Sequence, residues 1–242
     1  MSRFFVPPED ISEKEIFVSG KENNHLTRVL RLREKEEVVV FDGKGREYYG
    51  VIKEISSQRT LIEIKKVKER RREEKVKITL AQAIPKKAKL RDIIEKTTQL
   101  GVSGIIPMIS QRTIVRPPKE KERLHLQRWR RIALESCKQC GRTKPPYIGE
   151  IRSFRDLMVT THKYDLALMP SLIGERKGLK DISLREAKNI IFFIGPEGGF
   201  AKSEIDLAEK NRVVLVDLGE RVLKTDTAAI AMMAILNFVN ES

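Results

Sequence analysis

The sequence is poor in the residues that build disulfide frameworks and metal sites. It contains two cysteines, Cys137 and Cys140, and three histidines that are scattered along the chain. A structural zinc site needs about four ligands, and this single C-x-x-C pair has no second pair to complete one. The pair falls late in a segment of helical period that includes Trp129 and Ile132. Cysteine behaves there as a small apolar residue, so we predict no metal and a fold that depends on its hydrophobic core.

Long apolar runs and nucleotide-binding fingerprints are also missing. No apolar stretch approaches the roughly 20 residues that a membrane-spanning helix needs. The first residues lack the apolar run and cleavage site of a signal peptide, so we expect a cytoplasmic protein without a membrane partner. The sequence has no G-x-G-x-x-G after the first strand of its α/β part and no G-x-x-x-x-G-K-[ST] anywhere. Dinucleotide- and ATP-dependent activities therefore lack their usual sequence support.

Positive charge is abundant, and it is concentrated in one third of the chain. The formal net charge is +14. Residues 71–150 hold 20 basic and 8 acidic side chains, a net of +12, whereas residues 1–70 have a net of +2 and residues 151–242 have none. Clustered lysine and arginine side chains bind polyanions, because phosphate contacts release counterions. A solvated basic surface without a partner is the alternative, but the uneven distribution favours nucleic acid.

The pattern of apolar residues changes near residue 70, which predicts two domains. Short strands are expected at 38–41, 47–52 and 61–64, with a strong turn signal at 42–45. Several short strands in so few residues predict a small β-barrel over residues 1–70. A charge run at 65–77 has little apolar periodicity and marks the boundary.

Residues 71–242 alternate between strand and helix patterns. Strands are expected at 76–81, 104–109, 165–169, 189–194 and 213–218, and helices at 90–100, 119–140, 202–210 and 226–239. Alternation of this kind, with strands that are apolar on both faces, predicts an α/β fold with a parallel sheet. The loops after the last three strands contain glycine and proline, and ligands in such sheets sit beyond the carboxyl ends of the strands. We therefore expect a backbone-lined pocket for a nucleoside-like cofactor.

Two of these loops carry motifs that are specific in order and spacing. Residues 194–200 read Ile-Gly-Pro-Glu-Gly-Gly-Phe, and residues 218–228 read Leu-Gly-Glu-Arg-Val-Leu-Lys-Thr-Asp-Thr-Ala. Together they resemble the signature of the RsmE family, the 16S ribosomal RNA uridine-N3 methyltransferases of the SPOUT superfamily. Supporting matches, which extend the resemblance over nearly the whole chain, occur at 25–31, 41–43, 95–102, 111–112 and 139–142. Members usually carry Arg-Thr-Glu-Thr where this chain has Lys-Thr-Asp-Thr at 224–227, and lysine lacks the planar fork of arginine.

The resemblance implies a fold, an assembly and a cofactor. The implied fold is a PUA-like, RNA-binding β-barrel over residues 1–70, followed by a SPOUT methyltransferase domain with a deep trefoil knot over residues 71–242. The implied assembly is a homodimer, and S-adenosylmethionine would bind in the knotted loops. Carried over by position, the cofactor residues would be Leu168, Met169, Pro170, Ile194, Gly195, Glu197, Gly198, Leu218, Gly219, Val222, Leu223 and Thr225.

Methylation of uridine N3 imposes chemical requirements on the site. The imide nitrogen must lose its proton, and the resulting charge on the base must be stabilised. No histidine lies in the motif loops, so the proton acceptor is expected to be Glu197, or water assisted by Asp226. Arg221, Lys224 and Arg142 are candidates to stabilise the anionic base or to hold phosphate. Structural alternatives exist: Asp226 could cap the last helix, Glu197 could tie down its own loop, and Arg221 could form a surface ion pair.

The target base must be unpaired or flipped out of its stack, because base pairing hides N3. We therefore expect folded 16S ribosomal RNA, within the small subunit, as the partner. The residues predicted to contact it are His25, Arg28, Arg31, Arg112, Arg116, Arg128, Arg131 and Arg142. His25 is equally well explained as a packed side chain. Two other functions remain open: a SPOUT methyltransferase that acts on another RNA or another atom, and a noncatalytic RNA-binding ribosome-assembly factor.

Overall fold

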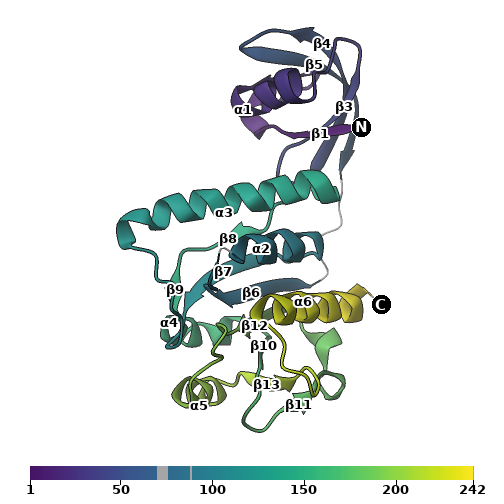
Figure 1. Ribbon diagram of the computed structural model, residues 1–242. Helices are drawn as coiled ribbons and strands as arrows, with labels where there is room; N and C mark the ends of the chain where they lie inside the picture. The colour runs from purple at the N-terminus through teal and green to yellow at the C-terminus, as the bar shows by residue number, and fades with distance from the viewer. Residues whose placement is uncertain (70–75, 88, 242) are drawn as a thin grey trace. The chain divides into compact units, whose positions relative to one another are not determined.

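The computed structural model describes residues 1–69, 76–87 and 89–241, which belong to two units. Unit 1 comprises Met1–Glu73 and Leu134–Pro145, and unit 2 comprises Glu74–Ala133 and Pro146–Ser242. The predicted boundary between residues 70 and 71 lies outside the described residues. The long helix α3 (Lys119–Cys140), teal in Figure 1, contributes its first part to unit 2 and its last part to unit 1.

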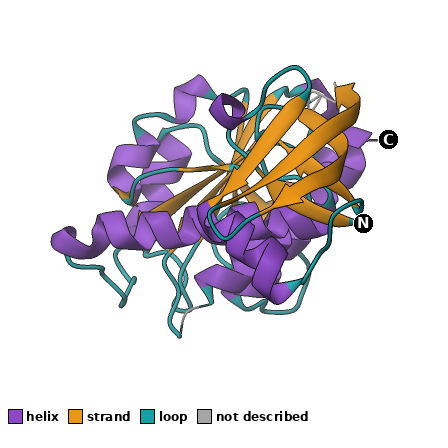
Figure 2. Ribbon diagram, turned by 90° about the horizontal axis from the view of Figure 1, so that it is seen from above, coloured by secondary structure: helices purple, strands orange, loops and turns teal. Residues whose placement is uncertain are grey.

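Unit 1 is built on a curled five-stranded sheet with the strand order β1-β3-β4-β5-β2. Its strands, the broad orange arrows beside the amino terminus in Figure 2, are β1 (Ser2–Phe5), β2 (Glu15–Ser19), β3 (Glu37–Phe41), β4 (Arg46–Ile55) and β5 (Arg59–Glu69). Strand β1 pairs in parallel with β3, and the other pairs are antiparallel. The register between β4 and β5 shifts twice, after Tyr49 and after Ile52, and such bulges bend a strand and increase its twist. Three of these strands were predicted from the sequence.

A close approach of two strands accounts for Gly50 in the middle of β4. A Cβ atom at this position would lie 2.5 Å from the Ile62 side chain and 2.7 Å from the Glu63 carbonyl oxygen. The core beneath the sheet contains fully buried side chains such as Phe4 and Ile16. A short helical segment, formed by α1 (Gly20–Asn24) and a π-helical turn (His25–Val29), covers it through Leu26.

Residues 134–145 belong to unit 1 through contacts with its strands and with α1. Lys138 forms ion pairs with Glu22 and Glu135. Arg3 pairs with the fully buried carboxylate of Glu47 and also donates from Nη2 to the Arg142 carbonyl oxygen at 3.4 Å. Neither cysteine forms a disulfide, and the buried Cys137 packs as the small apolar residue that its helical position predicted.

Unit 2 contains a parallel sheet of eight strands in the order β11-β13-β10-β12-β6-β7-β8, with β9 also paired to β7. The strands are β6 (Lys77–Ala83), β7 (Gly104–Ile109), β8 (Tyr147–Ile148), β9 (Arg152–Ser153), β10 (Leu166–Pro170), β11 (Lys177–Gly178), β12 (Asn189–Ile194) and β13 (Val214–Asp217). Every pairing in this sheet is parallel. The predicted α/β class with a parallel sheet is therefore confirmed.

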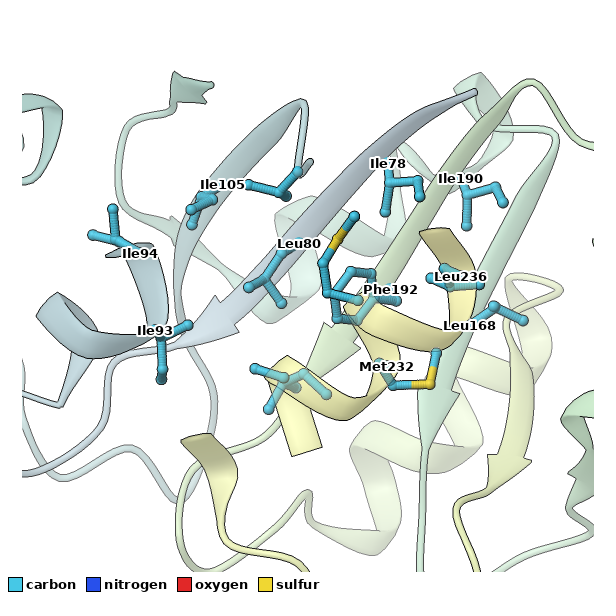
Figure 3. Packing of buried hydrophobic residues seen from close by; sticks show 14 of the residues in the cluster. Ile78, Leu80, Ile93, Ile94, Ile105, Leu168, Ile190, Phe192, Met232 and Leu236 are labelled. Atoms are coloured by element: carbon cyan, nitrogen blue, oxygen red, sulfur yellow. The ribbon is translucent and has the colours of Figure 1, made fainter. Parts of the chain in front are cut away.

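Helices cover both faces of this sheet (Figure 1). Helices α2 (Leu90–Gln99) and α6 (Thr225–Glu241), with the first part of α3, pack on one face; α4 (Phe154–Met158) and α5 (Lys202–Lys210) pack on the other. Alternate strand residues point to opposite faces, so Leu80 belongs to the first core and Ala81 to the second. Figure 3 shows the first core, where Leu80 and Phe192 of the sheet meet Ile93 of α2 and Met232 of α6.

The predicted helices of unit 2 begin and end close to their expected residues. Helix α2 stops before Gly101, whose φ of +93° lies in the left-handed region that favours glycine. Helix α4 is short and begins at Ser153, whose hydroxyl accepts from the Asp156 N–H at 3.1 Å. The sequence did not predict α4, the two-residue strands or the 3-10 turns at Pro8–Asp10, Thr161–Lys163, Leu179–Asp181 and Leu184–Glu186, because each is too short to display a period.

The described residues contain neither a membrane-spanning helix nor a cluster of metal-binding side chains. Among these residues, no helix combines the length and apolar character required to pass through a bilayer. The same part of the chain has no group of three or more His, Cys, Asp or Glu side chains placed to hold a metal ion.

Candidate active site

Three loops of unit 2 enclose a cavity of about 420 Å³ at one edge of the parallel sheet. They follow β10, β12 and β13, which are neighbours in the sheet, and they leave these strands at their carboxyl ends. Ligands of open parallel sheets sit at this edge. The cavity is larger than packing defects of a protein interior and has the size of a small-molecule site.

Most residues that the sequence assigned to a cofactor meet at this cavity. Those that line it are Pro170, Ile194, Gly195, Glu197, Gly198, Leu218, Gly219, Val222, Leu223 and Thr225. Leu168 and Met169 do not line it, because they precede the loop and lie inside β10. Both are fully buried, Leu168 in the core beside α6 (Figure 3) and Met169 in the core on the opposite face.

The backbone of the two motif loops is arranged around glycines. A Cβ atom at Gly195 would lie 3.2 Å from the ring of Phe200, tighter than ordinary contact, so a side chain there would displace that ring. Gly219 has a φ of +102°, and its N–H donates to Asp217 Oδ1 at 2.9 Å. Both loops therefore bring backbone groups to the cavity wall where a side chain would block them or strain the chain.

A chain of hydrogen bonds joins the end of β6 to both motif loops. Gln82 is fully buried, and its Nε2 donates to Ala83 O at 2.9 Å and to Thr225 Oγ1 at 3.0 Å. Thr225 Oγ1 in turn donates to Gly195 O at 2.7 Å. Gln82 was not predicted, because a single glutamine in an apolar strand carries no motif. Its position fixes the first residue of α6 against the glycine loop.

The two candidate proton acceptors differ in where they lie. Glu197 lines the cavity and is exposed, and its Oε1 accepts from the backbone N–H of Lys86 at 2.9 Å. Asp226 does not line the cavity; it occupies the first turn of α6, and its Oδ1 lies 3.6 Å from Lys89 Nζ. Glu197 thus forms a hydrogen bond that holds its loop, as the structural alternative requires. Asp226 carries a negative charge at the start of a helix, where such a charge is favourable. Their catalytic roles stay predictions.

Three cationic side chains line the cavity. Arg221 and Lys224 of the loop after β13 are exposed at its wall. Arg112, which the sequence assigned to RNA, also lines the cavity and donates from Nη1 to Gly198 O at 2.7 Å. Arg112 thereby joins the loop after β7 to the glycine loop, which the sequence did not predict.

Glu204 adds a second link between these two loops. It is buried, and its Oε1 accepts from the Gln111 N–H at 2.8 Å while its Oε2 accepts from the Ala201 N–H at 2.9 Å. The second bond satisfies an N–H at the start of α5, as a glutamate at the third helical position commonly does. The spacing of an acidic residue three positions after Ala201 is the sequence signal that could have predicted this bond. The link to Gln111 spans residues too distant for any sequence pattern.

The remaining predicted RNA residues lie in both units. In unit 1, His25, Arg28 and Arg31 are exposed along the π-helical turn and the residues after it, and the His25 ring makes an edge contact with Phe4 at 6.3 Å between centroids. Arg142 is half-buried in the same unit. Exposed side chains in unit 2 are Arg116, Arg128 and Arg131.

Unit 1 has a hollow of its own, of about 890 Å³, on the curled sheet. Its lining combines the cations Lys44, Arg46 and Lys144 with the carboxylates Glu13, Asp42 and Glu69, and Arg46 Nε lies 3.2 Å from Glu69 Oε1. Burial and the nearby Asp42 carboxylate raise the pKa of Tyr48, which contributes an aromatic ring to the lining.

The cavity also has exposed apolar walls, of which Val222 was predicted from the sequence and Leu172 and Ile173 were not. Leu172 and Ile173, after β10, are 60% and 49% exposed, and Val222 is 75% exposed. Large apolar side chains gathered in one cavity with this exposure mark a ligand surface. Leu172 and Ile173 follow Pro170, the last residue of β10.

Family models match almost the whole chain. A model described as the RNA methyltransferase domain matches residues 72–237, and one described as the RNA methyltransferase PUA domain matches residues 18–65. This chain belongs to that RNA methyltransferase family. The predicted family is thereby confirmed, and the cavity lies in the part matched by the methyltransferase model.

Relatives and solved structures of methyltransferases align over most of their lengths. Proteins named Ribosomal RNA small subunit methyltransferase E are similar: that of Bacillus subtilis is 27% identical over 100% of this chain and 98% of its own. That of Mesomycoplasma hyopneumoniae is 30% identical over 96% and 97%. A solved methyltransferase E from Neisseria gonorrhoeae bound to S-adenosyl methionine is 30% identical, with a TM-score of 0.88 over 99% of this chain and 98% of that one. A Legionella pneumophila methyltransferase in complex with the cofactor is 31% identical, with a TM-score of 0.91 over 98% and 97%.

Proposed function

We propose that this methyltransferase transfers a methyl group from S-adenosylmethionine to N3 of one specific uridine in 16S ribosomal RNA, within the small subunit. The observation that carries the proposal is the 420 Å³ cavity, where both motif loops meet with Arg112, Arg221 and Lys224 on its walls. The names of the relatives and the cofactor bound by two of the structural neighbours support the reaction class.

The chemistry of the cavity fits this cofactor. An adenine ring needs apolar contact on its faces and hydrogen-bonding groups at its edge, and the cavity combines Leu172, Ile173 and Val222 with exposed backbone of the glycine loops. Packing within the loop requires glycine at position 195, because a Cβ atom there would lie 3.2 Å from the Phe200 ring. When bound, the cofactor supplies an electrophilic methyl group on a sulfonium; everything else is supplied by the chain.

Arg221 and Lys224 are proposed to stabilise the charge that develops on the uracil ring. Loss of the N3 proton leaves negative charge shared by O2, N3 and O4, and preorganised cations lower the energy of that state. Both side chains line the cavity and are exposed, so a base that enters can reach them. Of the two, Arg221 offers the planar fork that suits two acceptors on one ring edge.

Glu197 is proposed as the proton acceptor. It is the candidate carboxylate that lines the cavity, beside Arg221 and Lys224, whereas Asp226 does not line it. The bond from the Lys86 N–H to Oε1 orients this carboxylate and leaves it capacity to accept further hydrogen bonds. Asp226 is proposed to serve the start of α6 and its pair with Lys89.

The finer features of the fold belong to the same proposal. We infer that unit 1 acts as the PUA-like RNA-binding domain and that the loops after β10, β12 and β13 form a trefoil knot. In support, the chain leaves β13 on the far side of β10 from β12 and returns to place Thr225 against Gly195 and Gln82.

A homodimer is inferred from the exposed apolar side chains Ile235 and Phe238 of α6, and light scattering tests it.

The basic residues of both units are proposed to hold the RNA. Arg116, Arg128 and Arg131 of unit 2 and His25, Arg28, Arg31 and Arg142 of unit 1 make up this set, with the cations around the unit 1 hollow. Each phosphate contact adds to the dependence of affinity on salt concentration. Binding of 16S ribosomal RNA should therefore weaken steeply between low and physiological salt.

A methyl-mapping experiment tests the function. Small subunits from a bacterial strain that lacks the corresponding methyl group are incubated with the purified protein and the methyl-labelled cofactor, and the RNA is digested and analysed by mass spectrometry. One uridine should gain a methyl group on N3. A methyl group on a ribose 2′-hydroxyl or on another RNA would contradict the proposal. Cofactor binding by calorimetry without any transfer, or no cofactor binding at all, would favour a noncatalytic assembly factor.

A further inference from the structure

The loop between β6 and α2 has no role in the reaction described so far, yet it borders the cavity. This lysine loop comprises Ile84–Lys87 and Lys89, with Ala88 outside the described residues, and it carries Lys86, Lys87 and Lys89 within four positions. Its start is fixed in the core, since Ile84 and Pro85 are buried and the Ile84 N–H donates to Met108 O at 3.0 Å. The two lysines that follow are exposed.

Three contacts join this segment and the strand before it to the glycine loop and to the start of α6. Just before it, Gln82 binds Thr225 at the start of α6. In its middle, the Lys86 N–H donates to Glu197 of the glycine loop at 2.9 Å. At its end, Lys89 Nζ lies 3.6 Å from Asp226 Oδ1. Since Thr225 and Glu197 line the cavity, the lysine loop is held at its rim.

The contacts leave two ammonium groups uncompensated. Asp226 pairs with Lys89, and the Oε1 atom of Glu197 accepts from backbone. In the part of the chain that the structure describes, neither Lys86 nor Lys87 forms a side-chain ion pair or hydrogen bond. The rim therefore presents two exposed positive charges beside the wall that carries the cations of the cavity.

Backbone conformation adds an independent sign that a side chain is needed here. Lys87 has a φ of +55°, in the left-handed region that glycine adopts without strain. A lysine at this position costs stability that glycine would not, and strained residues of this kind cluster at functional sites. Within the described residues, the side chain of Lys87 forms no hydrogen bond or ion pair that would offset this cost.

We propose that Lys86 and Lys87 bind the backbone phosphates next to the nucleotide whose base enters the cavity. The inference rests on the proposed function for the identity of that nucleotide. A flipped base brings its own two phosphates to the mouth of the pocket, and they cannot follow it into a space that also holds a cofactor. Ammonium groups on long flexible stems suit phosphates, which they bind as point charges. The bond to Glu197 aligns this clamp with the proton acceptor.

Binding of a short RNA with and without backbone charge tests the clamp. The probe is a fluorescein-labelled, uridine-rich single-stranded RNA, compared with the same RNA carrying neutral methylphosphonate linkages beside one uridine. The wild-type protein should bind the charged probe more tightly. In K86A/K87A the difference should vanish, with Kd for the charged probe raised on the order of tenfold and the salt slope lowered by about 1.4. Cofactor affinity should not change.

Three further variants separate the clamp from bulk charge and from folding. K86R/K87R should keep most of the discrimination. K163A/K210A removes the same two charges from exposed sites of unit 2 outside the cavity lining, and it should keep discrimination in full. K87G keeps the left-handed backbone, so it should raise thermal stability slightly while weakening binding of the charged probe.

The outcomes for the clamp and for the reaction can be told apart. Wild-type methylation of uridine N3 without any preference for the charged probe would overturn the clamp and leave the reaction intact. Preference lost in K86A/K87A, in a protein that transfers no methyl group, would support the phosphate site and refute the reaction. Equal losses in K86A/K87A and K163A/K210A would reduce the effect to bulk charge and overturn the proposal.

Discussion

The faces of the parallel sheet in unit 2 and its carboxyl edge are stabilised in different ways. On the faces, side chains such as Leu80 and Phe192 pack into two apolar cores, and every second residue of a strand contributes to the same one. At the edge, the segments at the ends of four strands, β6, β7, β12 and β13, are joined by single polar contacts: Gln82 to Thr225, Lys86 to Glu197, Arg112 to Gly198 and Glu204 to Gln111.

This difference between faces and edge predicts which substitutions should affect folding and which should affect the reaction. The free energy gained by burying apolar side chains is roughly proportional to the buried area and does not depend on the direction of a contact. The packed faces therefore determine stability. Polar contacts at the edge depend on direction and leave an unsatisfied buried group when one partner is lost. Changes on the faces should lower the free energy of unfolding and spare the folded site, whereas changes at the edge should act on the site.

The largest expected effect is on the faces. Leu80→Ala removes a fully buried side chain between α2 and α6 and should lower the free energy of unfolding by about 2–5 kcal/mol. Urea denaturation followed by circular dichroism measures it. Leu124→Ala, at a side chain that is 67% exposed, is the matched control and should change little. A Leu80→Ala protein of normal stability but reduced cofactor affinity would contradict the assignment of stability to the faces and of binding to the edge.

At the edge, the expected effect is on turnover. Arg221→Ala removes a cation proposed to stabilise the anionic base and should lower kcat by about 10²–10³, with cofactor Kd and the free energy of unfolding nearly unchanged. Arg185→Ala, at an exposed position outside the cavity lining, is the control. Single-turnover methylation separates kcat from binding. Turnover at the wild-type rate would leave Arg221 without a catalytic role.

How far the sequence predicts the structure follows the same division. Short runs that are apolar on both faces predicted β10, β12 and β13, and helical periods predicted α5 and α6, because face packing repeats along the chain. Those patterns also account for Leu168 and Met169: the family resemblance assigned them to the cofactor, yet strand alternation directs both into the cores. The motifs brought most lining residues together, since each motif is one continuous loop.

The contacts between loops could not be predicted from the sequence. Gln82 and Thr225 are 143 residues apart, and Lys86 and Glu197 are 111 apart. Which polar group reaches which loop depends on the strand order, and no local pattern encodes that order. The same reason explains why Arg112, predicted as a phosphate contact from its charge, lies in the cavity wall.

Glu197 can be tested for two roles by a matched pair of substitutions. Glu197→Gln keeps an oxygen that can accept from the Lys86 N–H but removes the base, and Glu197→Ala removes both. We expect both to lower kcat by about 10²–10⁴ and only Glu197→Ala to weaken binding of the charged RNA probe as well. Turnover of Glu197→Gln near the wild-type rate would assign Glu197 to loop tying alone and would transfer proton acceptance to water.

A buried edge residue should affect both properties. Glu204→Gln leaves one of the Gln111 and Ala201 N–H groups facing an amide instead of an acceptor, which should cost about 1–3 kcal/mol. Because Gln111 precedes Arg112, cofactor affinity should fall too. Hydrogen exchange at the Gln111 and Ala201 amides reports the loss directly. Glu209→Gln, exposed on the same helix, should alter neither exchange nor affinity.

The smallest expected effect separates backbone from side chain at the edge. Gly219→Ala places a Cβ in open space but on a residue with a φ of +102°, so the cost is conformational, about 1 kcal/mol, and should show as a several-fold rise in cofactor Kd. Gly104→Ala, within β7, adds a Cβ at ordinary contact distances, the nearest being 3.5 Å from Thr79, and should leave cofactor Kd unchanged. Titration calorimetry compares the two. If Gly104→Ala weakened cofactor binding as much as Gly219→Ala, the loss at Gly219 would not come from its left-handed backbone conformation. The loop after β13 would then have no special requirement for a residue in that conformation.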